Sequence, residues 1–159
     1  MNVCCFEGNI VVFKDFGETQ LSVAKLDKQL CFALYSASSQ LTSIYRPLLE
    51  PLDLTYTQFI VLMALWEKDE ISISQLAKTA GLSKATMTPL LKRLEQKGLI
   101  HRKVLVDNER QKSIVLTEAG REISLQSAEI TNNAFCATGL TEQEASDMIA
   151  LCQKLVSLP

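Results

Sequence analysis

The chain has 159 residues, of which 47% are hydrophobic and 21% charged, so it has the size and composition of one soluble globular domain and not of a disordered chain. No apolar run approaches the roughly 18 residues of a membrane span, and the N-terminus lacks the basic start and small-residue cleavage site of a signal peptide. These features predict a cytoplasmic protein without membrane contact.

The net charge of −2 hides an uneven distribution along the chain. Residues 78–112 contain nine Lys or Arg and three acidic residues, a local charge of +6, which leaves −8 for the rest. This division favours a module that presents one basic face to nucleic-acid phosphates. A solvated charged surface explains the division equally well, so the local sequence pattern has to decide.

Five cysteines are the second unusual feature. A chain without export signals is expected to keep them reduced, which argues against a structural disulfide framework. Zinc binding is disfavoured because no C-x-x-C pair occurs and the only histidine, His101, is distant in sequence from every cysteine. We expect no cofactor, and either a redox role or simple burial for each thiol. The cysteines are Cys4, Cys5, Cys31, Cys136 and Cys152.

In chain order, the first predicted element is an amphipathic helix within residues 29–49. At about 100° per residue, polar and aromatic side chains fall on the same stripe as Cys31, beside a separate aliphatic stripe. Phenol and hydroxyl donors on this stripe could stabilise a Cys31 thiolate and speed its oxidation. The alternative is that Cys31 is a small buried hydrophobic residue. The stripe contains Tyr35, Ser38, Thr42 and Tyr45.

The next apolar segment predicts a second helix. Residues at helical spacing indicate a helix from about Thr57 to Lys68, with a cap signal at Thr55 or Thr57. The β-branched run at residues 71–73 then predicts a short strand.

Residues after this strand predict a helix-turn-helix. A short helix is expected over residues 74–80, a turn at Gly81, and a longer helix capped by Ser83 and ended by Gly98. Pro89 is expected to bend or locally loosen the longer helix, because an interior proline removes a hydrogen bond.

The longer helix has the residue types of a recognition helix. Its early side chains are small, polar and basic, so its backbone can approach a DNA groove while hydroxyl and ammonium groups reach phosphates or base edges. Leu90, Leu91 and Leu94 are expected to pack inward. Simple helix capping is the alternative explanation for the serine and threonines. The candidate DNA contacts are Ser83, Lys84, Thr86, Thr88 and Lys92.

Two β-rich runs within residues 100–117 flank the polar sequence DNER and predict a hairpin. Arg110 is expected at its tip, placed to enter a minor groove, with a solvated turn residue as the alternative. A helix-turn-helix followed by a basic hairpin is a winged helix. The predicted fold is therefore mainly α with a small β-hairpin (α+β).

Two amphipathic C-terminal helices are predicted in residues 117–140 and 141–158. A protein with one recognition helix gains affinity by dimerising on a two-fold site, so the expected partners are a second copy of the chain and double-stranded operator DNA. The expected division is an N-terminal extension at 1–22, a helical dimerisation region at 23–56 and 118–159, and a winged helix-turn-helix DNA-binding region at 57–117.

Four stretches resemble the MarR family of winged-helix repressors, and specifically its organic hydroperoxide resistance regulators. The resemblance covers about Leu26 to Gly120 in strong motifs and continues at the level of helices to the C-terminus. The run QLCFxLY belongs to the hydroperoxide-sensing branch and not to members that bind phenolic ligands. The stretches are LDKQLCFALYSAS, YRPLLEPLDLTYTQF, LLKRLEQKGLI and ERQKSIVLTEAG.

The resemblance implies a repressor that leaves its operator when organic hydroperoxides oxidise Cys31 to a sulfenic acid. It also implies that Cys136 is a resolving cysteine, which forms an intersubunit disulfide. Three tyrosines match those that surround the reactive thiol in the family, some of them reaching it from the partner subunit. These are Tyr35, Tyr45 and Tyr56.

The chain departs from the family pattern in three places. It reads LSKATMTP where relatives commonly read LDSGTLTP, so Ser83 replaces an acidic residue beside Lys84, which points to a different operator. Its hairpin reads DNER where Asp-x-Arg is usual, so the aspartate that steadies Arg110 is Asp107 or is absent. Residues 1–22 precede the usual start, and a poorly packed tail is favoured over an added strand.

Two other classes of function fit parts of the sequence. A MarR-type repressor released by a small aromatic ligand in the dimer cleft needs Cys31 only as a buried residue, and salicylate-like compounds should then release Cys31→Ser as well. A thiol peroxidase needs the same reactive cysteine but neither a helix-turn-helix nor a basic hairpin. We therefore expect a regulator and not an enzyme.

Overall fold

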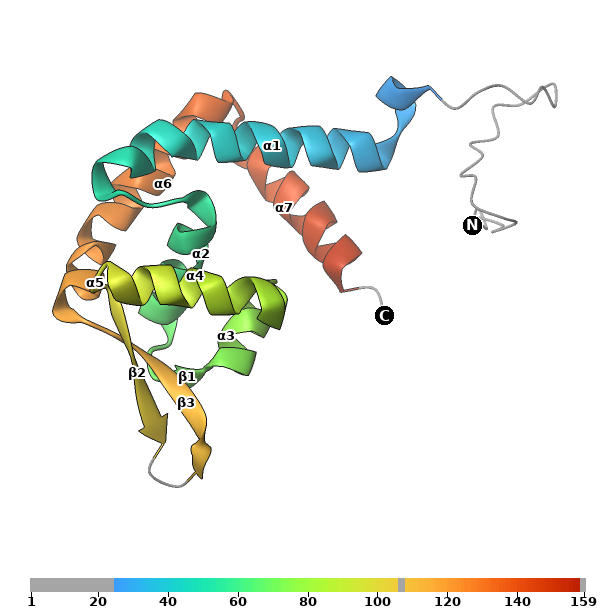
Figure 1. The fold of residues 1–159 in the computed structure, drawn as a ribbon. Helices are drawn as coiled ribbons and strands as arrows, with labels where there is room; N and C mark the ends of the chain where they lie inside the picture. Colours follow the sequence, from blue (N-terminus) through green and yellow to red (C-terminus); the bar gives the residue numbers. More distant parts are fainter. Residues whose placement is uncertain (1–24, 106–107, 158–159) are drawn as a thin grey trace, which may run out of the picture.

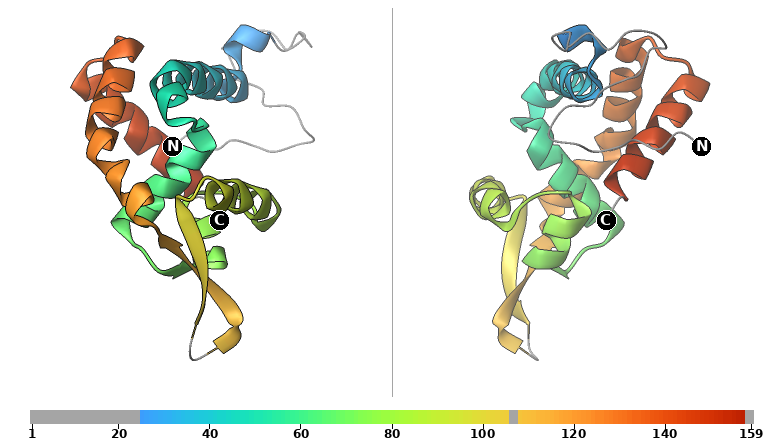
Figure 2. Two further views of the ribbon diagram at one scale, coloured as in Figure 1. Left: turned by 60° about the vertical axis from the view of Figure 1, so that its left-hand side comes forward. Right: turned by 90° about the vertical axis from the view of Figure 1, so that its right-hand side faces the viewer.

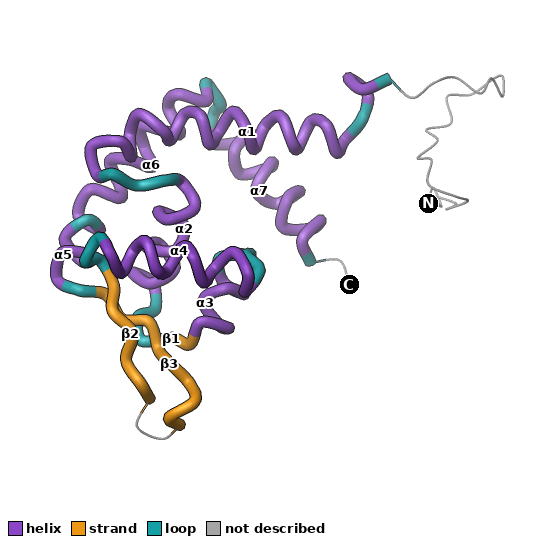
Figure 3. Tube along the Cα trace, in the orientation of Figure 1, coloured by secondary structure: helices purple, strands orange, loops and turns teal. Residues whose placement is uncertain are grey.

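The computed structural model describes residues 25–105 and 108–157, with side chains described in these ranges except at 104–112. Cys4, Cys5 and the whole of the predicted extension at 1–22 lie outside the described residues. Helices predominate, and three short strands form one antiparallel sheet (Figures 1 and 3). The elements are η1 (Leu26–Lys28), α1 (Leu30–Leu49), η2 (Glu50–Leu52), α2 (Tyr56–Glu67), β1 (Ile71–Ser72), α3 (Ile73–Thr79), α4 (Lys84–Gln96), β2 (Ile100–Leu105), β3 (Asn108–Leu116), α5 (Glu118–Glu122), α6 (Ser124–Thr138) and α7 (Glu142–Val156).

The helix-turn-helix and the hairpin are present as predicted. α3 and α4 form the former, and β2 and β3 form the hairpin that follows. β1 pairs with the free edge of β3, so that the strand order is β1-β3-β2, with Ile71 opposite Ile114. The strand predicted at 71–73 ends at Ser72, because the Ser72 hydroxyl caps α3 by accepting a hydrogen bond from the Gln75 backbone N–H at 3.2 Å.

Capping residues determine where the helices begin and end. Thr55 caps α2, and its hydroxyl and the Gln58 side chain accept hydrogen bonds from each other's backbone N–H groups, so α2 begins at Tyr56. Gly98 follows α4 at a φ of 70°, a conformation that glycine adopts without steric cost. α4 continues through Pro89, which lies on its exposed side, so this proline does not interrupt the helix.

The hydrophobic core lies between α2, α3, α4 and the sheet, and the C-terminal part of α1 packs against it. No single helix in the described ranges is long and apolar enough to cross a membrane, and only the bent pair of Leu30–Leu52 and Tyr56–Glu67 meets the length and hydropathy criteria together. The largest fully buried side chains are those of Leu49, Phe59, Val61, Leu62, Leu65, Leu76, Met87, Leu91, Leu94, Ile100 and Ile114.

The C-terminal region differs from its prediction in one respect. The helix expected within residues 117–140 is divided at Ile123 into α5 and α6. The Ser124 and Ser127 hydroxyls donate to the carbonyls of Arg121 and Ser124, each at 2.6 Å, and such bonds to the preceding turn bend helices. α6 packs along α1, whereas α7 has no buried residue.

Candidate DNA-binding surface and thiol site

The exposed side of α4 lies beside the hairpin on one side of the molecule (Figure 2). Lys84, Thr88 and Lys92 recur every four residues on this side, and at about 100° per residue they form one stripe. The opposite side is buried, as was predicted for its leucines, and includes a methionine that the prediction omitted. The buried residues are Met87, Leu90, Leu91 and Leu94.

The hydroxyl groups at the start of α4 take part in local hydrogen bonds. The Ser83 Oγ accepts from the Thr86 backbone N–H at 3.1 Å and lies 2.9 Å from the Thr86 Oγ1. The Thr88 hydroxyl donates to the Lys84 carbonyl at 3.1 Å. Capping therefore accounts for Ser83 and Thr86, while Lys84 and Lys92 form no ion pair among the described side chains. On the stripe of Lys84, Thr88 and Lys92, the two ammonium groups are thus the donors without a described ion-pair partner.

The hairpin tip lies at residues 106–107, outside the described residues. The register of β2 and β3 changes close to the tip, where Val104 is opposite Lys112 but Leu105 is opposite Asn108. Residues 109–111 of β3 are the extra residues of this irregularity. The backbone of Arg110 lies within them, close to the tip where it was expected, and its side chain lies outside the described residues.

Cys31 is the second residue of α1, and its thiol is free and exposed. Tyr35, one turn later, is also largely exposed, at 71%. No described side chain of the same chain donates a hydrogen bond to this thiol. The single chain thus shows neither the buried cysteine nor the donor-stabilised thiolate that the sequence left as alternatives.

Tyr45 and Tyr56 form a separate aromatic cluster near the other end of α1. Their ring centroids are 4.6 Å apart, and the Tyr45 ring lies 6.0 Å from that of Phe59. Tyr45 follows Cys31 by fourteen residues, so the two are about 21 Å apart along the helix and cannot meet within one chain. Burial raises the pKa of Tyr45, and the neighbouring Tyr56 raises it further, so the Tyr45 phenol remains a hydrogen-bond donor at neutral pH.

The other two described cysteines lie on the C-terminal helices. Cys136 is free and exposed near the end of α6, the helix that packs along α1. Cys152 is half-buried in α7. It lines an apolar groove of about 490 Å³ between α7 and Leu41 of α1. In one chain, the Cys31 thiol thus lies at the start of α1, and the Cys136 thiol lies on the neighbouring helix α6.

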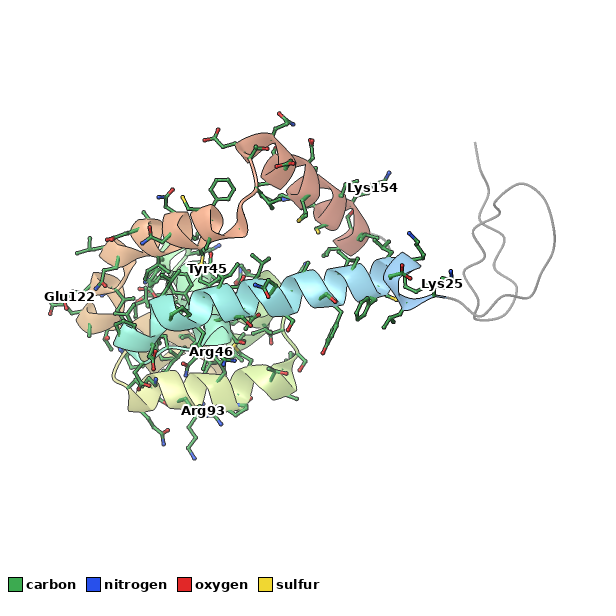
Figure 4. The ribbon with its side chains drawn as sticks, turned by 90° about the horizontal axis from the view of Figure 1, so that it is seen from above. Lys25, Tyr45, Arg46, Arg93, Glu122 and Lys154 are labelled. Carbon is green, nitrogen blue, oxygen red and sulfur yellow. The ribbon has the colours of Figure 1, made fainter. Side chains whose placement is uncertain are left out.

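A cleft of about 440 Å³ opens where the loop between α1 and α2 meets the C-terminal end of α4. An ion pair between Lys97 and Asp53, with 2.7 Å between Nζ and Oδ2, joins its two sides. Arg46 of α1 and Arg93 of α4 also line it and form no ion pair among the described residues (Figure 4). No sequence signal indicated this cleft, because its two sides come from residues 46–58 and 93–97, which are at least 35 positions apart.

Sequence reasoning also assigned no role to the contacts that hold α5. Thr117 and Gly120 lie against the turn between α4 and β2, and Trp66 donates from its indole Nε1 to the Gly120 carbonyl at 2.9 Å. We call Trp66, Gly98, Leu99, Thr117 and Gly120 the α5 junction. Helix caps and a lone tryptophan are too common for the sequence to reveal such a contact.

The winged helix and its exposed α4 coincide with a known family pattern. The MarR family model matches residues 54–112, from the start of α2 into β3. The organic hydroperoxide resistance transcriptional regulator of Bacillus subtilis strain 168 is 37% identical over 141 residues, which make up 89% of this chain and 94% of that protein. This chain belongs to the MarR family. Its predicted family and winged-helix fold are thereby confirmed.

Two further similarities place this MarR-family chain among DNA-binding regulators. The HTH-type transcriptional regulator SarZ of Staphylococcus aureus strain USA300 is 40% identical over 132 residues, 83% of this chain and 89% of SarZ. The solved structure of overoxidised AbfR bound to DNA is 31% identical, with a TM-score of 0.67, and the match covers 84% of this chain and 95% of that one. The protein is a transcriptional regulator and not an enzyme, as predicted.

Proposed function

We propose that this MarR-family regulator is a homodimeric repressor that leaves its operator when an organic hydroperoxide oxidises Cys31, by way of an intersubunit disulfide with Cys136. The observation that carries the proposal is the position of Cys31. It is exposed at one end of α1, about 21 Å along the helix from Tyr45, whose ring lies against that of Tyr56. A second subunit can complete this divided site.

Exposed apolar side chains support the dimer. Leu30 of α1 is 58% exposed, and Leu151 and Val156 of α7 are 65% and 85% exposed, more than an isolated soluble chain usually leaves in contiguous helices. We propose that residues 23–56 and 118–159 dimerise and that residues 57–117 bind DNA. The apolar groove beside Leu41 lies within the proposed interface.

A two-fold axis explains how the site is completed. If the α1 helices of two subunits pack antiparallel, the Cys31 end of one helix lies beside the Tyr45 end of the other. The phenol of Tyr45 then reaches the thiol from the partner subunit, while Tyr35 reaches it from the same helix. Cys136 lies near the end of α6, the helix that packs along α1, and in the same arrangement we propose that its thiol approaches the Cys31 of the other subunit.

The chemistry proceeds in two balanced steps. The Cys31 thiolate attacks the terminal oxygen of the hydroperoxide, the O–O bond breaks, and the departing alkoxide takes a proton to form an alcohol while Cys31 becomes a sulfenic acid. A phenol such as that of Tyr45 can donate a hydrogen bond to this alkoxide. The Cys136 thiol of the partner subunit then loses its proton and attacks the Cys31 sulfur as a thiolate, and the hydroxide that leaves Cys31 takes up that proton and departs as water.

We propose that the disulfide, and not further oxidation of Cys31, is the step that releases DNA. AbfR is bound to DNA in its overoxidised as well as its reduced form, which supports a release step other than overoxidation. A disulfide needs Cα atoms within roughly 7 Å. Its formation therefore moves α6 of one subunit toward the start of α1 of the other, and this changes the spacing of the two α4 helices on DNA.

An operator-binding titration with and without cumene hydroperoxide tests the proposal. Wild-type protein should lose affinity about a thousandfold on oxidation, equivalent to about 4 kcal/mol of coupling, whereas Cys31→Ser should bind DNA equally in both conditions. Non-reducing gels should show a covalent dimer in wild type and in the control Cys152→Ser, but not in Cys31→Ser or Cys136→Ser. A covalent dimer that persists in Cys136→Ser assigns the resolving thiol elsewhere, and equal binding by oxidised wild type overturns the proposed switch.

The cleft beside α4 supports a second candidate, in which a small aromatic acid releases the repressor. Arg46 and Arg93 could bind a carboxylate there, between α1 and the C-terminal end of α4. Release by salicylate that is equal in wild type and Cys31→Ser, and lost in Arg93→Gln, favours this candidate. The DNA-binding role of Ser83, Lys84, Thr86, Thr88, Lys92 and Arg110 is common to both proposals.

A further inference from the structure

We infer that the α5 junction is the positioning element that makes α4 move with α6, so that movement of Cys136 reaches the DNA-binding surface. This inference rests on the proposed disulfide switch and names the residues that transmit it. Along the chain, the connection from α4 to α6 passes through the hairpin and the short helix α5, which packs against both β3 and α6.

The Thr117 hydroxyl joins α5 to the end of α4, because it donates one hydrogen bond and accepts another. The hydroxyl donates to the Gly98 carbonyl at 2.6 Å and accepts the backbone N–H of Gly120 at 3.1 Å. The Thr117 backbone N–H also donates to the Leu99 carbonyl at 3.0 Å. Thr117, which caps α5, is thus hydrogen-bonded to Gly98 and Leu99 in the turn between α4 and β2.

Gly120 brings the two backbones into direct contact. It is buried, and a Cβ atom at this position would overlap the carbonyl oxygen of Leu99 and crowd the Leu116 side chain. Its own carbonyl accepts the indole N–H of Trp66, whose ring packs edge-on against the core residue Phe59 with centroids 5.6 Å apart. α5 is therefore held from one side by the α4–β2 turn and from the other by α2.

A third contact ties α5 to the base of the hairpin. One carboxylate oxygen of Asp69 accepts backbone N–H groups of Leu116 and Glu70 at 3.0 and 2.8 Å, and the other accepts from the Arg121 guanidinium at 2.7 Å. α5 is thus hydrogen-bonded to β3 as well as to α4 and α2. With three partners, α5 is part of the winged unit and not a loose linker.

α6 continues from α5 with little change of backbone conformation. Ile123, the one residue between them, has helical angles of φ −59° and ψ −28°. The fifteen residues of α6 extend about 22 Å from this point. A shift of Cys136 near its far end therefore rotates α5, and with α5 the end of α4, as long as the α5 junction holds.

The alternative connection at the end of α4 is weaker. The Lys97 side chain bonds Asp53 in the loop after α1, but the Asp53 side chain is 92% exposed. Exposed ion pairs contribute little because water and salt screen them. The α5 junction combines the close approach of the buried Gly120 to Leu99 with four neutral hydrogen bonds, and it is the stronger of these two connections to the end of α4.

Substitutions that remove the junction's hydrogen bonds without removing its packing test the inference in the full-length protein. Thr117→Val keeps the branched shape but loses both hydroxyl bonds, and Trp66→Phe keeps an aromatic ring but loses the bond to Gly120. Thr117→Ser restores the hydroxyl. Thr131→Val is the matched control, because the Thr131 hydroxyl bonds to the Ser127 carbonyl within α6 and not to the winged part.

Each variant is treated with cumene hydroperoxide, followed by a non-reducing gel and an operator titration. All should form the covalent dimer, and the reduced forms should bind DNA like wild type. Oxidation should lower the affinity of wild type, Thr117→Ser and Thr131→Val by about a hundredfold or more, but that of Thr117→Val with Trp66→Phe by less than about tenfold. A loss equal to that of wild type in the double variant, or in both single variants should the double one fail to fold, overturns the inference. A wild type that forms no covalent dimer overturns the proposed function instead.

Discussion

Lys84 differs from its hydroxyl neighbours at the start of α4. Ser83, Thr86 and Thr88 already use a hydroxyl in hydrogen bonds of the helix, whereas the Lys84 ammonium has no described partner. A hydroxyl in a cap can still accept or share a bond with DNA, but its loss also weakens the helix. The lysine is therefore the residue at which a DNA contact can be measured without a change in folding.

Lys84→Gln should weaken operator binding and lower the slope of log affinity against log salt by about 0.9, because one phosphate contact releases fewer counterions when its charge is removed. The measurement is a titration at several salt concentrations. Lys154→Gln, an exposed lysine on α7, should leave the slope unchanged. The same experiment applies to Arg110→Ala. An unchanged affinity and slope in Lys84→Gln removes this residue from the interface.

The Asp69 carboxyl makes the stability of the fold depend on pH. Burial of its carboxyl favours a raised pKa, but the N–H groups of Leu116 and Glu70 and the Arg121 guanidinium together hold the pKa below its ordinary value near 3.8. The stabilisation is therefore complete above the unfolded-state pKa and is lost as the pH falls through the lower folded-state pKa. Asp69→Asn should cost about 1 to 2 kcal/mol at pH 7. Urea titrations should show that this difference from wild type narrows below about pH 4; a difference independent of pH contradicts the assignment.

At the scale of elements, two glycines that look alike in the sequence have different surroundings. Gly139 ends α6 at a φ of 71° and has open space where a Cβ atom would lie, whereas Gly120 lies in α5 against the Leu99 carbonyl. A methyl group at Gly139 meets only the cost of left-handed backbone. At Gly120 it must displace the turn that connects α4 to β2.

Gly120→Ala should therefore lower the free energy of unfolding by about 3 kcal/mol or more, while Gly139→Ala should lower it by about 1 to 2 kcal/mol. Urea unfolding of the two variants measures the difference. Gly120→Ala should also weaken DNA binding of the reduced protein, since the end of α4 has to shift. Equal destabilisation of the two variants means that the close approach of α5 to Leu99 is absent.

At the scale of the whole molecule, the length of α1 separates the two parts of the proposed thiol site. Its start carries Cys31 and Tyr35 in an exposed setting, and its end carries Tyr45 against the core. In one chain, the thiol that we propose to react and the phenol that we propose to surround it therefore lie at opposite ends of α1. Dimerisation is the simplest way to unite them, because a two-fold axis completes two sites at once.

Ile149→Glu and Leu151→Glu on α7 should convert the protein to a monomer at micromolar concentration, because each places a charge in the proposed apolar interface. Analytical ultracentrifugation reports the mass, and operator affinity should fall at least about tenfold as bivalent binding is lost. Ser146→Glu, an exposed polar position of the same helix, is the control. If both apolar variants remain dimeric, α7 is not part of the interface.

The sequence by itself determined the winged helix, because its signals are local. Ser83 before a run of apolar residues at helical spacing, Gly98 after it, and two β-rich runs around DNER depend on neighbours a few positions away. These signals located α4 and the hairpin to within a residue or two, and the family motifs added the expected roles of Cys31 and Cys136. A break as small as that at Ile123 was missed, because serine side chains bonding to the preceding turn leave the helical pattern unchanged.

Only the tertiary structure decided which residues of separate elements lie next to each other. Residues of one helical stripe, such as Cys31 and Tyr45, share a face in projection, but the rise of the helix separates them by about 21 Å. The contacts of Thr117 with Gly98, of Gly120 with Leu99 and of Lys97 with Asp53 depend on how separate elements pack, and no local preference of the residues records that. Periodicity and capping residues predict structure among residues that are close in sequence. The close approach of two backbones depends instead on how the whole core packs.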